Sequence, residues 1–122
     1  SIYGGDYATP DGTCRRDYLH VMDLAEGHIK ALDYLKNKGA HIFNLGTGLP
    51  VSVLEMVRSF EDVTGLIIPY SIVGRRLGDI DEFWACAEKA ERLLKWKANR
   101  SLKKMIIDTW KWQSHNPFGY GS

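Results

Sequence analysis

Two pairs of adjacent arginines are the residues of this sequence best suited to hold an anion. Arg15 and Arg16 stand in the run GTCRRDY, and Arg75 and Arg76 stand in the run VGRRLGD, which ends at Asp79. Each guanidinium presents a planar fork of donors that fits two phosphate oxygens. Arginines from both pairs that converge on one pyrophosphate would form a clamp, and a nearby carboxylate could accept hydrogen bonds from ribose hydroxyls. The alternative is that both pairs form ion pairs with local acids.

The glycine-rich run NLGTG, residues 44–48, is a second candidate for anion binding. It follows a strand-like segment, Ser52 heads the next helical pattern, and helix N-termini favour anions. However, the run lacks the full G-x-G-x-x-G pattern, and a tight turn needs glycine in any case. We therefore favour a structural turn and keep phosphate binding as the alternative.

The sequence contains no arrangement of a nucleophile with a base and an acid. Tyr34 and Lys38 have the Y-x-x-x-K spacing in which a lysine lowers the pKa of a catalytic tyrosine. They fall at the end of a predicted helix, and no serine is positioned before them, so we interpret the spacing as a coincidence. The four histidines have no metal-ligand spacing.

The composition predicts one globular domain over residues 1–122. The chain is 44% hydrophobic and 25% charged, with a formal net charge of +1 at pH 7, which argues against disorder and against a nucleic-acid partner. No apolar run approaches the ~20 residues of a membrane span, and the N-terminal residues lack a signal-peptide pattern. We expect a cytoplasmic protein in which Cys14 and Cys86 are free thiols.

Strand-like and helical patterns alternate along the chain, which predicts an α/β fold. The strand-like runs are residues 16–21, 41–46 and 66–73, and the helical patterns are residues 23–39, 52–65, 87–96 and 101–113. Asp23 is predicted to cap the first helix, and Ser52 with Glu55 is predicted to form a capping box at the second. Strict alternation in the run RDYLHV places Arg16 and Tyr18 on one face. Residues 41–45 are apolar on both faces, as in a strand of a larger parallel sheet, so the chain is expected to need neighbours that it does not contain.

Five runs of the sequence also resemble a known family. The runs DGTCRRDYLHVMDLAEGHIKAL, IFNLGTG, SVLEMV, GRRLGD and DTWKWQSHNPFGY are similar, in this order, to the C-terminal part of the UDP-glucose (UDP-galactose) 4-epimerases, which are extended short-chain dehydrogenase/reductases. The resemblance covers essentially the whole chain. It implies the α/β, substrate-binding C-terminal portion of such an enzyme, with few short strands and about four helices, incomplete without the N-terminal Rossmann part. Residues 41–45 would then lie in the large parallel sheet of that part.

The resemblance implies that this portion binds UDP or a UDP-hexose. The positions that match UDP-binding positions of the family are Tyr3, Arg16, Tyr18, Val53, Arg76 and Asp79. Arg16 and Arg76 match the arginines that hold the pyrophosphate, whereas Asp79 matches the aspartate that touches the ribose. Tyr3 matches the aromatic residue that lies along the nucleotide. We expect no nucleic-acid or membrane partner, and we expect self-association through an exposed strand and sheet edge.

The family uses NAD for its chemistry, and the resemblance implies NAD-dependent inversion at C4 of the sugar in the full-length enzyme. In the family, NAD takes a hydride from C4 and a tyrosine base removes the hydroxyl proton. The G-x-x-G-x-x-G run that binds NAD and the catalytic serine with Y-x-x-x-K do not occur at matching positions in these 122 residues. We therefore expect no catalytic residue, no bound NAD and no activity on this chain alone. The alternatives are a non-catalytic nucleotide-sugar-binding or interaction module, and a truncated product without function.

Four positions depart from the family pattern. Cys14 replaces the usual glycine, Leu77 replaces the usual glutamate or proline, and Phe83 cannot make a hydroxyl contact that some relatives make. Arg15 is an additional charge beside the expected clamp. It is either a second phosphate contact or a solvated surface charge, and we favour the surface charge.

Overall fold

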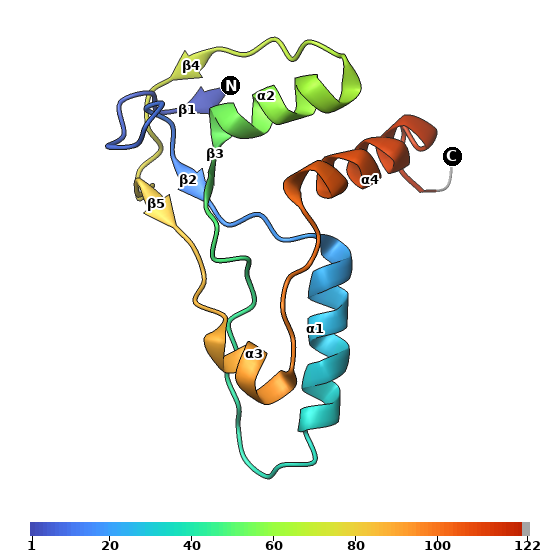
Figure 1. Cartoon of the computed structure of the whole chain (residues 1–122). Coiled ribbons are helices and arrows are strands. Elements are labelled where there is room, and N and C mark those ends of the chain that lie inside the picture. The colour runs from blue at the N-terminus through green and yellow to red at the C-terminus, as the bar shows by residue number, and fades with distance from the viewer. Residues whose placement is uncertain (121–122) are drawn as a thin grey trace.

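The computed structural model describes residues 1–120, so Gly121 and Ser122, the last two residues of the expected domain, lie outside the described residues. The elements in chain order are β1 (Ile2–Tyr3), β2 (Arg15–Arg16), α1 (Val21–Tyr34), β3 (Val51–Ser52), α2 (Val53–Thr64), β4 (Ile72–Val73), β5 (Glu82–Phe83), α3 (Glu88–Leu94) and α4 (Leu102–His115). The predicted α/β content of few short strands and about four helices is confirmed (Figure 1).

The strands form two small sheets at one end of the molecule. In the first, β1 and β4 pair in parallel, with Ile2 opposite Ile72. In the second, β2 lies in the centre, antiparallel to β3 and parallel to β5. Arg16 thus stands opposite Val51 on one side and Phe83 on the other. This arrangement brings the two arginine-containing segments to the same end of the molecule.

Most of the residues that were predicted to form strands are not in strands. Only the first residue of the run 16–21 is in a strand, residues 41–46 form none, and the run 66–73 contributes only its last two residues as β4. A strand needs a hydrogen-bonding neighbour, and residues 41–46 have no such neighbour within residues 1–120. Figure 1 shows the connection from α1 to β3 returning along the molecule without joining either sheet.

Helix α1 begins two residues earlier than predicted and has a different cap. His20 is the N-cap residue, and its Nδ1 accepts a hydrogen bond of 3.0 Å from the Met22 amide. The prediction that Asp23 caps this helix is wrong, because its carboxylate is fully buried and pairs with Arg100. The helix ends at Tyr34, before the glycine at position 39 that was expected to stop it.

Helix α2 follows its local sequence signals. The Ser52 hydroxyl accepts a hydrogen bond of 3.0 Å from the Glu55 amide, and the Glu55 carboxylate accepts one of 3.3 Å from the Ser52 amide. The predicted capping box is therefore confirmed. The helix stops at Gly65, whose φ of 71° is a left-handed conformation that glycine adopts without strain. Ser101 caps α4 in the same way, through the Lys104 amide at 3.2 Å.

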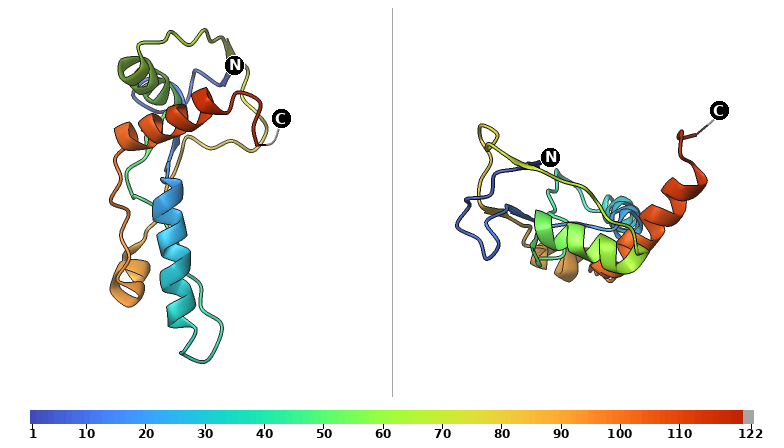
Figure 2. Two further views of the ribbon diagram at one scale, coloured as in Figure 1. Left: turned by 90° about the vertical axis from the view of Figure 1, so that its right-hand side faces the viewer. Right: turned by 90° about the horizontal axis from the view of Figure 1, so that it is seen from above.

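Two pairs of helices give the molecule its elongated shape (Figure 2). Helix α4 packs against α2, where Phe60 and Trp110 meet edge to face at 5.5 Å. Helix α1 extends away from the sheets with α3 beside it. The small core between α1 and α3 centres on Trp96, whose indole nitrogen donates to the Asp23 carbonyl at 2.8 Å.

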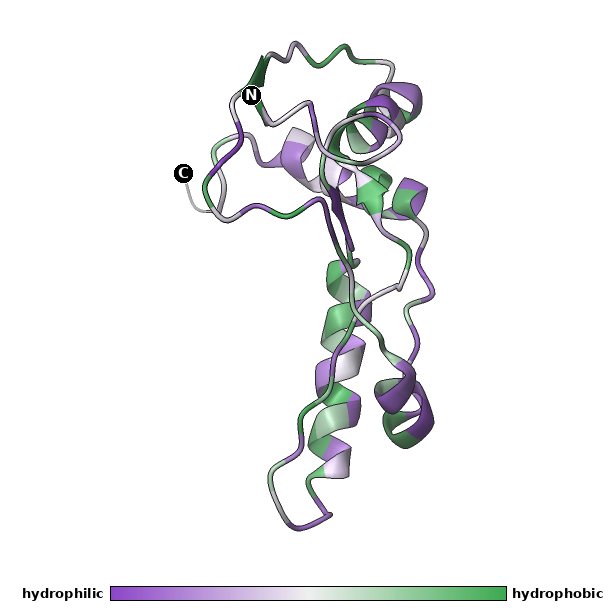
Figure 3. Cartoon of the chain, turned by 90° about the vertical axis from the view of Figure 1, so that its left-hand side faces the viewer, coloured by the Kyte–Doolittle hydropathy of each residue, from purple (hydrophilic) through white to green (hydrophobic). Residues whose placement is uncertain are grey.

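Large apolar side chains of α1 and of its C-cap residue, Leu35, face outward in the structure. Ile29, Leu32 and Leu35 are 61%, 66% and 66% exposed, whereas Asp23 and Gly27 on the opposite face are buried. Figure 3 shows hydrophobic residues along the length of this helix. The side that a free-standing domain would bury is thus left without a partner. None of the helices within residues 1–120 has the length and apolar character needed to cross a membrane.

Candidate functional site

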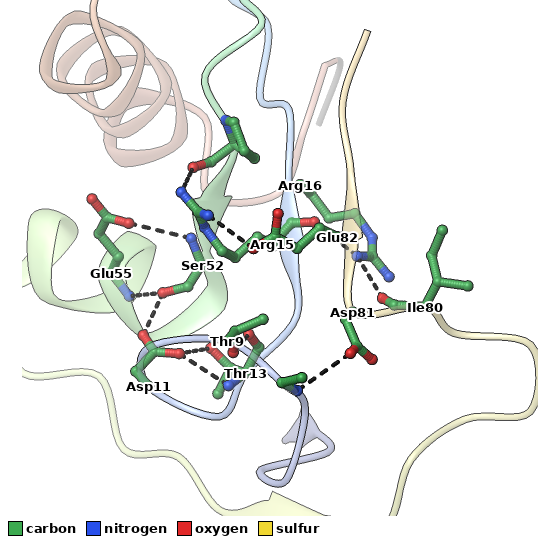
Figure 4. A network of polar contacts seen from close by, with 12 residues as sticks. Thr9, Asp11, Thr13, Arg15, Arg16, Ser52, Glu55, Ile80, Asp81 and Glu82 are labelled. Atoms are coloured by element: carbon green, nitrogen blue, oxygen red, sulfur yellow. Dashed lines mark hydrogen bonds and ion pairs between the residues drawn. The ribbon is translucent and has the colours of Figure 1, made fainter.

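The adjacent arginines of β2 point to opposite sides of the strand (Figure 4). Arg15 Nη1 donates to Glu82 Oε1 at 2.9 Å, and its Nη2 donates to the Pro50 carbonyl at 2.8 Å. Arg15 therefore links β5 to the segment that enters β3. The prediction of a solvated surface charge is wrong, because the guanidinium is half-buried and bonded on both sides.

Arg16 is fixed on the other side of β2 by backbone oxygens. Its Nη1 donates to the carbonyls of Arg15 and Ile80, at 2.8 and 3.0 Å. Its Nη2 lies 3.8 Å from Asp79 Oδ1. Two carbonyl contacts hold the guanidinium in place, and the Nη2 side of the group faces the carboxylate.

Arg76 contacts the same carboxylate from the other arginine pair. Its Nε donates to Asp79 Oδ2 at 3.1 Å, and this hydrogen bond raises the pKa of Arg76. The Asp79 side chain is 19% exposed, whereas that of Arg76 is 60% exposed. The Arg76 guanidinium also lies 4.7 Å from the centre of the Tyr3 ring, a cation–π contact. Tyr3, Arg16, Arg76 and Asp79 thus come together, and we call these four residues the Asp79 cluster.

The Asp79 cluster carries more positive than negative charge. Two guanidinium groups share one carboxylate, which leaves a net charge of +1. Glu82 neutralises Arg15, whereas Arg75 pairs with two aspartates, so that the group around Arg75 carries a net charge of −1. The surplus charge therefore lies at the arginines that the resemblance assigns to the pyrophosphate.

Arg75 has a structural role. Its Nε donates to Asp6 Oδ1 at 2.8 Å, its Nη2 donates to the Asp6 carbonyl, and its Nη1 lies 3.9 Å from Asp81 Oδ1. The hydrogen bond with the Asp6 side chain raises the pKa of Arg75. Its guanidinium also covers the Tyr7 ring at 4.0 Å. Pairing with local acids, the alternative to a phosphate clamp, thus describes the contacts of Arg75 with Asp81 and of Arg76 with Asp79. Arg15 instead pairs with an acid 67 residues away in the sequence.

Tyr18 and Val53 lie beside Cys14 rather than within the Asp79 cluster. The Val53 amide donates to the Cys14 carbonyl at 3.2 Å. Burial raises the pKa of Tyr18, the neighbouring Cys14 adds to this rise, and the positive charge of Arg16 opposes it. Within residues 1–120, neither side chain makes a hydrogen bond or ion pair with the Asp79 cluster, so their contact with a ligand stays a prediction. Both cysteines are free thiols, as predicted.

The NLGTG loop is bonded to an internal carboxylate. Asp17 accepts hydrogen bonds from the Thr47 amide at 2.9 Å, the Thr47 hydroxyl at 2.5 Å and the Gly48 amide at 3.1 Å. Burial raises the pKa of Asp17, but these bonds and one from the Ala85 amide outweigh it and hold the pKa below its usual range. A Cβ atom at Gly46 would lie 2.4 Å from Asp17 Oδ2. The donors that could cradle a phosphate are thus used by the fold, and the structural turn is confirmed.

Comparison with known proteins shows the family of the chain. The sequence pattern of the NAD dependent epimerase/dehydratase family matches residues 2–46. The UDP-glucose 4-epimerase of Drosophila melanogaster is 51% identical over 100% of this chain and 36% of its own length. Those of Yersinia enterocolitica and Bacillus subtilis are 56% and 54% identical over 98% and 100% of this chain. The chain belongs to the UDP-glucose 4-epimerase family and is a portion of a longer protein of that family.

Solved structures of this family have the same fold. The UDP-glucose 4-epimerase of Bifidobacterium longum, solved in complex with NAD+ and UDP, matches 98% of this chain with a TM-score of 0.93 and 47% identity. The enzyme of Stenotrophomonas maltophila, solved with NAD and a formylated UDP-arabinopyranose, matches 95% with a TM-score of 0.89 and 48% identity. The chain spans about 36% of the length of the relatives that it matches.

The described residues do not fit the NAD of the family. The one glycine-rich loop after a strand-like run has its donors bonded to Asp17. Tyr34 and Lys38 do not share a helix face, because α1 ends at Tyr34. The Tyr34 ring instead packs edge to face against His41 and Phe43, at 5.0 and 5.3 Å. The interpretation of the Y-x-x-x-K spacing as a coincidence is therefore confirmed.

Asp11, which was not among the predicted site residues, bonds two segments of the site to each other. Its Oδ1 accepts from the Thr13 amide and hydroxyl at 2.9 and 2.7 Å, and its Oδ2 accepts from the Ser52 hydroxyl (Figure 4). The aspartate thereby ties the loop before β2 to the start of α2. The run DGT could have revealed the first contact, since aspartate often bonds the amide two residues on in such a turn. The bond to Ser52 spans 41 residues and has no local signal.

Proposed function

We propose that this chain is the UDP-binding portion of a UDP-glucose 4-epimerase, in which Arg16 and Arg76 hold the diphosphate of UDP or a UDP-hexose. The observation that carries the proposal is the sharing of one carboxylate, Asp79, by two guanidinium groups that lie about 60 residues apart in the sequence. A surplus positive charge with open donor sides is what a diphosphate needs. The UDP bound in the similar Bifidobacterium longum structure supports this assignment.

The contacts of Arg16 and Arg76 suit the two residues to different roles in holding a diphosphate. Arg16 is half-buried and fixed by two carbonyls, so little side-chain freedom is lost when it binds an anion. Arg76 is exposed and free to turn one edge of its guanidinium toward a second phosphate. Asp79 would then keep one oxygen for a ribose hydroxyl. Tyr3, beneath Arg76, presents a flat aromatic surface for the nucleoside.

Tyr18 and Val53 complete the proposed contacts. Burial keeps the Tyr18 hydroxyl protonated at neutral pH, since it raises the pKa further above 7. The hydroxyl can therefore donate to a ligand oxygen, and the positive charge of Arg16 acts on it. Val53 opens α2 beside Cys14 and offers an apolar contact. We assign both residues to the edge of the site, outside the diphosphate clamp.

The whole enzyme, in this proposal, inverts the configuration at C4 of the sugar with NAD, and this chain supplies substrate binding. We assign no catalytic residue to the chain. The reaction needs a base and a hydride acceptor, and the described residues offer neither a fitting tyrosine–lysine pair nor a fitting NAD loop. The portion alone should therefore bind without turnover.

An alanine substitution at Arg76 tests the clamp. Isothermal titration of the 122-residue chain with UDP should show binding, and Arg76→Ala should weaken it by at least tenfold, because a charge-assisted hydrogen bond contributes about 1.5–3 kcal/mol. Arg92→Ala is the matched control, since Arg92 is an exposed arginine on α3. It should leave the affinity unchanged. Equal losses in the two variants would contradict the clamp.

A further inference from the structure

The segment that carries Arg76 has little packing to hold it in place. Residues 71–78 are all exposed, and the Arg76 side chain is 60% exposed. Gly74 and Gly78 flank the two arginines, and the φ of 88° at Gly78 lies in the left-handed region that glycine adopts without strain. The position of Arg76 must therefore come from specific contacts of this segment rather than from burial.

The Arg75 side chain extends the link between the segments that contain β1 and β4. The two strands pair in parallel, and the Gly4 amide donates to the Val73 carbonyl at 2.9 Å. Two residues further along each segment, Arg75 Nε donates to Asp6 Oδ1 at 2.8 Å, and its Nη2 donates to the Asp6 carbonyl. The guanidinium thus joins the two segments just where the paired strands have ended.

Tyr7 and Gly4 form a firm base under Arg75. The guanidinium lies 4.0 Å from the centre of the Tyr7 ring, and Tyr7 is only 4% exposed. A Cβ atom at Gly4 would lie 3.0 Å from Arg75 Cγ and 2.3 Å from Tyr7 Cε2, so the backbone at Gly4 touches both side chains. An isolated surface ion pair contributes little, but two acceptors for one planar fork and a buried ring beneath it define a single position for Arg75.

The backbone that Arg75 fixes is the backbone from which Arg76 extends. Arg76 lies over the Tyr3 ring and bonds to Asp79, and Tyr3 directly precedes Gly4, against which Arg75 packs. Arg75 therefore sets the starting point of the Arg76 side chain relative to Tyr3. Its own paired aspartates leave a net charge of −1 around Arg75, which disfavours an anion at that guanidinium.

We propose that Arg75 is a positioning residue of the UDP site: its bonds to Asp6 and its contact with Tyr7 hold Arg76 over Tyr3, and Arg75 itself does not contact the ligand. This inference rests on the proposed function. It gives a role to the first arginine of the run GRRLGD, to which the resemblance assigns none. Because its backbone is held, the exposed Arg76 loses less conformational freedom when it binds a phosphate.

Nitrogen-15 NMR of the arginine side chains tests the position of Arg76 without a ligand. In the unchanged 122-residue chain, the Nε–H of Arg76 is bonded to Asp79 and its guanidinium lies over the Tyr3 ring, so its resonance should differ from those of exposed arginines. Arg75→Gln removes the fork and should move this resonance toward that of Arg92, an exposed arginine on α3. The Arg92 resonance should stay where it is.

Isothermal titration with UDP tests the effect on the site. Arg75→Gln should weaken UDP binding about two- to tenfold, the penalty for ordering one long side chain on binding. In a chain that already carries Arg76→Ala, the same substitution should have no further effect, because Arg75 acts through Arg76. Asp6→Ala should also weaken binding, although it removes a negative charge, whereas Arg92→Gln should leave the affinity unchanged.

Every other result overturns the inference. An unmoved Arg76 resonance in Arg75→Gln would show that Arg76 keeps its place unaided. Equal losses of affinity with and without Arg76, or tighter binding by Asp6→Ala, would show that Arg75 itself attracts the ligand. Loss of the folded state in Arg75→Gln, measured by circular dichroism, would show a general support of the fold. Absence of UDP binding by the unchanged chain would overturn the proposed function together with the inference, whereas UDP binding with an unmoved resonance would overturn the inference alone.

Discussion

The sharing of Asp79 by Arg16 and Arg76 distinguishes these arginines from their sequence neighbours. Adjacent guanidiniums repel, but strand geometry sends Arg15 and Arg16 to opposite sides of β2, where each meets its own acceptors. The sequence indicated the two pairs, and the resemblance singled out one member of each. The pairing of Arg15 with Glu82 bridges 67 residues, so only the folded chain shows which arginine is structural.

Asp17 makes acid stability a testable property of the site. Because its pKa is lowered in the folded state, its contribution to stability is complete above the unfolded pKa of about 4 and is lost as pH falls through the lower folded pKa. Asp17→Asn should lower the free energy of unfolding by about 1–3 kcal/mol at pH 7, since a half-buried carboxylate that accepts amide bonds is lost. Urea unfolding at pH 7 and at about pH 3 measures the free energy of unfolding of the variant and of the unchanged chain.

The comparison of the two pH values, together with a control variant, checks the role of the Asp17 carboxylate. The difference between Asp17→Asn and the unchanged chain should shrink at the lower pH, where the carboxylate of the unchanged chain becomes protonated. Asp33→Asn, an exposed aspartate on α1, should match the unchanged chain at both pH values. A difference of constant size across the two pH values would contradict the assigned role of the carboxylate.

At the scale of elements, local signals predicted helix ends well and strands poorly. The cap of α2 was predicted because a serine hydroxyl bonds an amide only three residues away, and the cap of α4 has the same spacing. The predicted cap of α1 was wrong, because the Asp23 carboxylate is bonded to Arg100, 77 residues further along the chain. Strand pairing is likewise non-local, and residues 41–46 have no neighbouring strand in the described part of the chain.

The outward face of α1 should make the chain associate. Its exposed Ile29 and Leu32, with the C-cap residue Leu35, form an apolar stripe whose burial would remove hydrocarbon from water. We expect a dimer or larger species by size-exclusion chromatography with light scattering, and Leu32→Glu should shift it toward monomer. Ile67→Glu makes the same change at a residue that is 87% exposed outside α1, and should leave the mass unchanged. A monomeric unchanged chain would contradict this expectation.

At the scale of the whole molecule, the chain is a portion of a longer protein of the UDP-glucose 4-epimerase family. It spans about 36% of the length of its relatives, and Ile29 and Leu32 on one side of α1 are exposed in the described residues. The resemblance predicted this relationship from motifs over the whole chain, whereas periodicity alone predicted only an α/β unit with missing neighbours. Side-chain contacts such as the charge balance of the Asp79 cluster could not be predicted, because they join segments about 60 residues apart.

The proposal that this chain binds the substrate but supplies no catalytic residue predicts the result of an activity assay. The 122-residue chain, supplied with NAD and UDP-galactose, should convert substrate only at the background rate of a coupled assay, because residues 1–120 offer neither a fitting tyrosine–lysine pair nor a fitting NAD loop. A full-length relative serves as the positive control for the assay. Turnover above background by the chain alone would show that a catalytic group lies within it.

The most direct test of the account is ³¹P NMR of UDP mixed with the 122-residue chain. If Arg16 and Arg76 hold the diphosphate, both phosphorus resonances should shift or broaden as the chain is added. The effect should weaken strongly with Arg16→Gln, which keeps a polar side chain but is shorter and removes the charge and the planar fork of donors. Two unperturbed phosphorus resonances at millimolar chain, or an undiminished effect in Arg16→Gln, would contradict the diphosphate clamp.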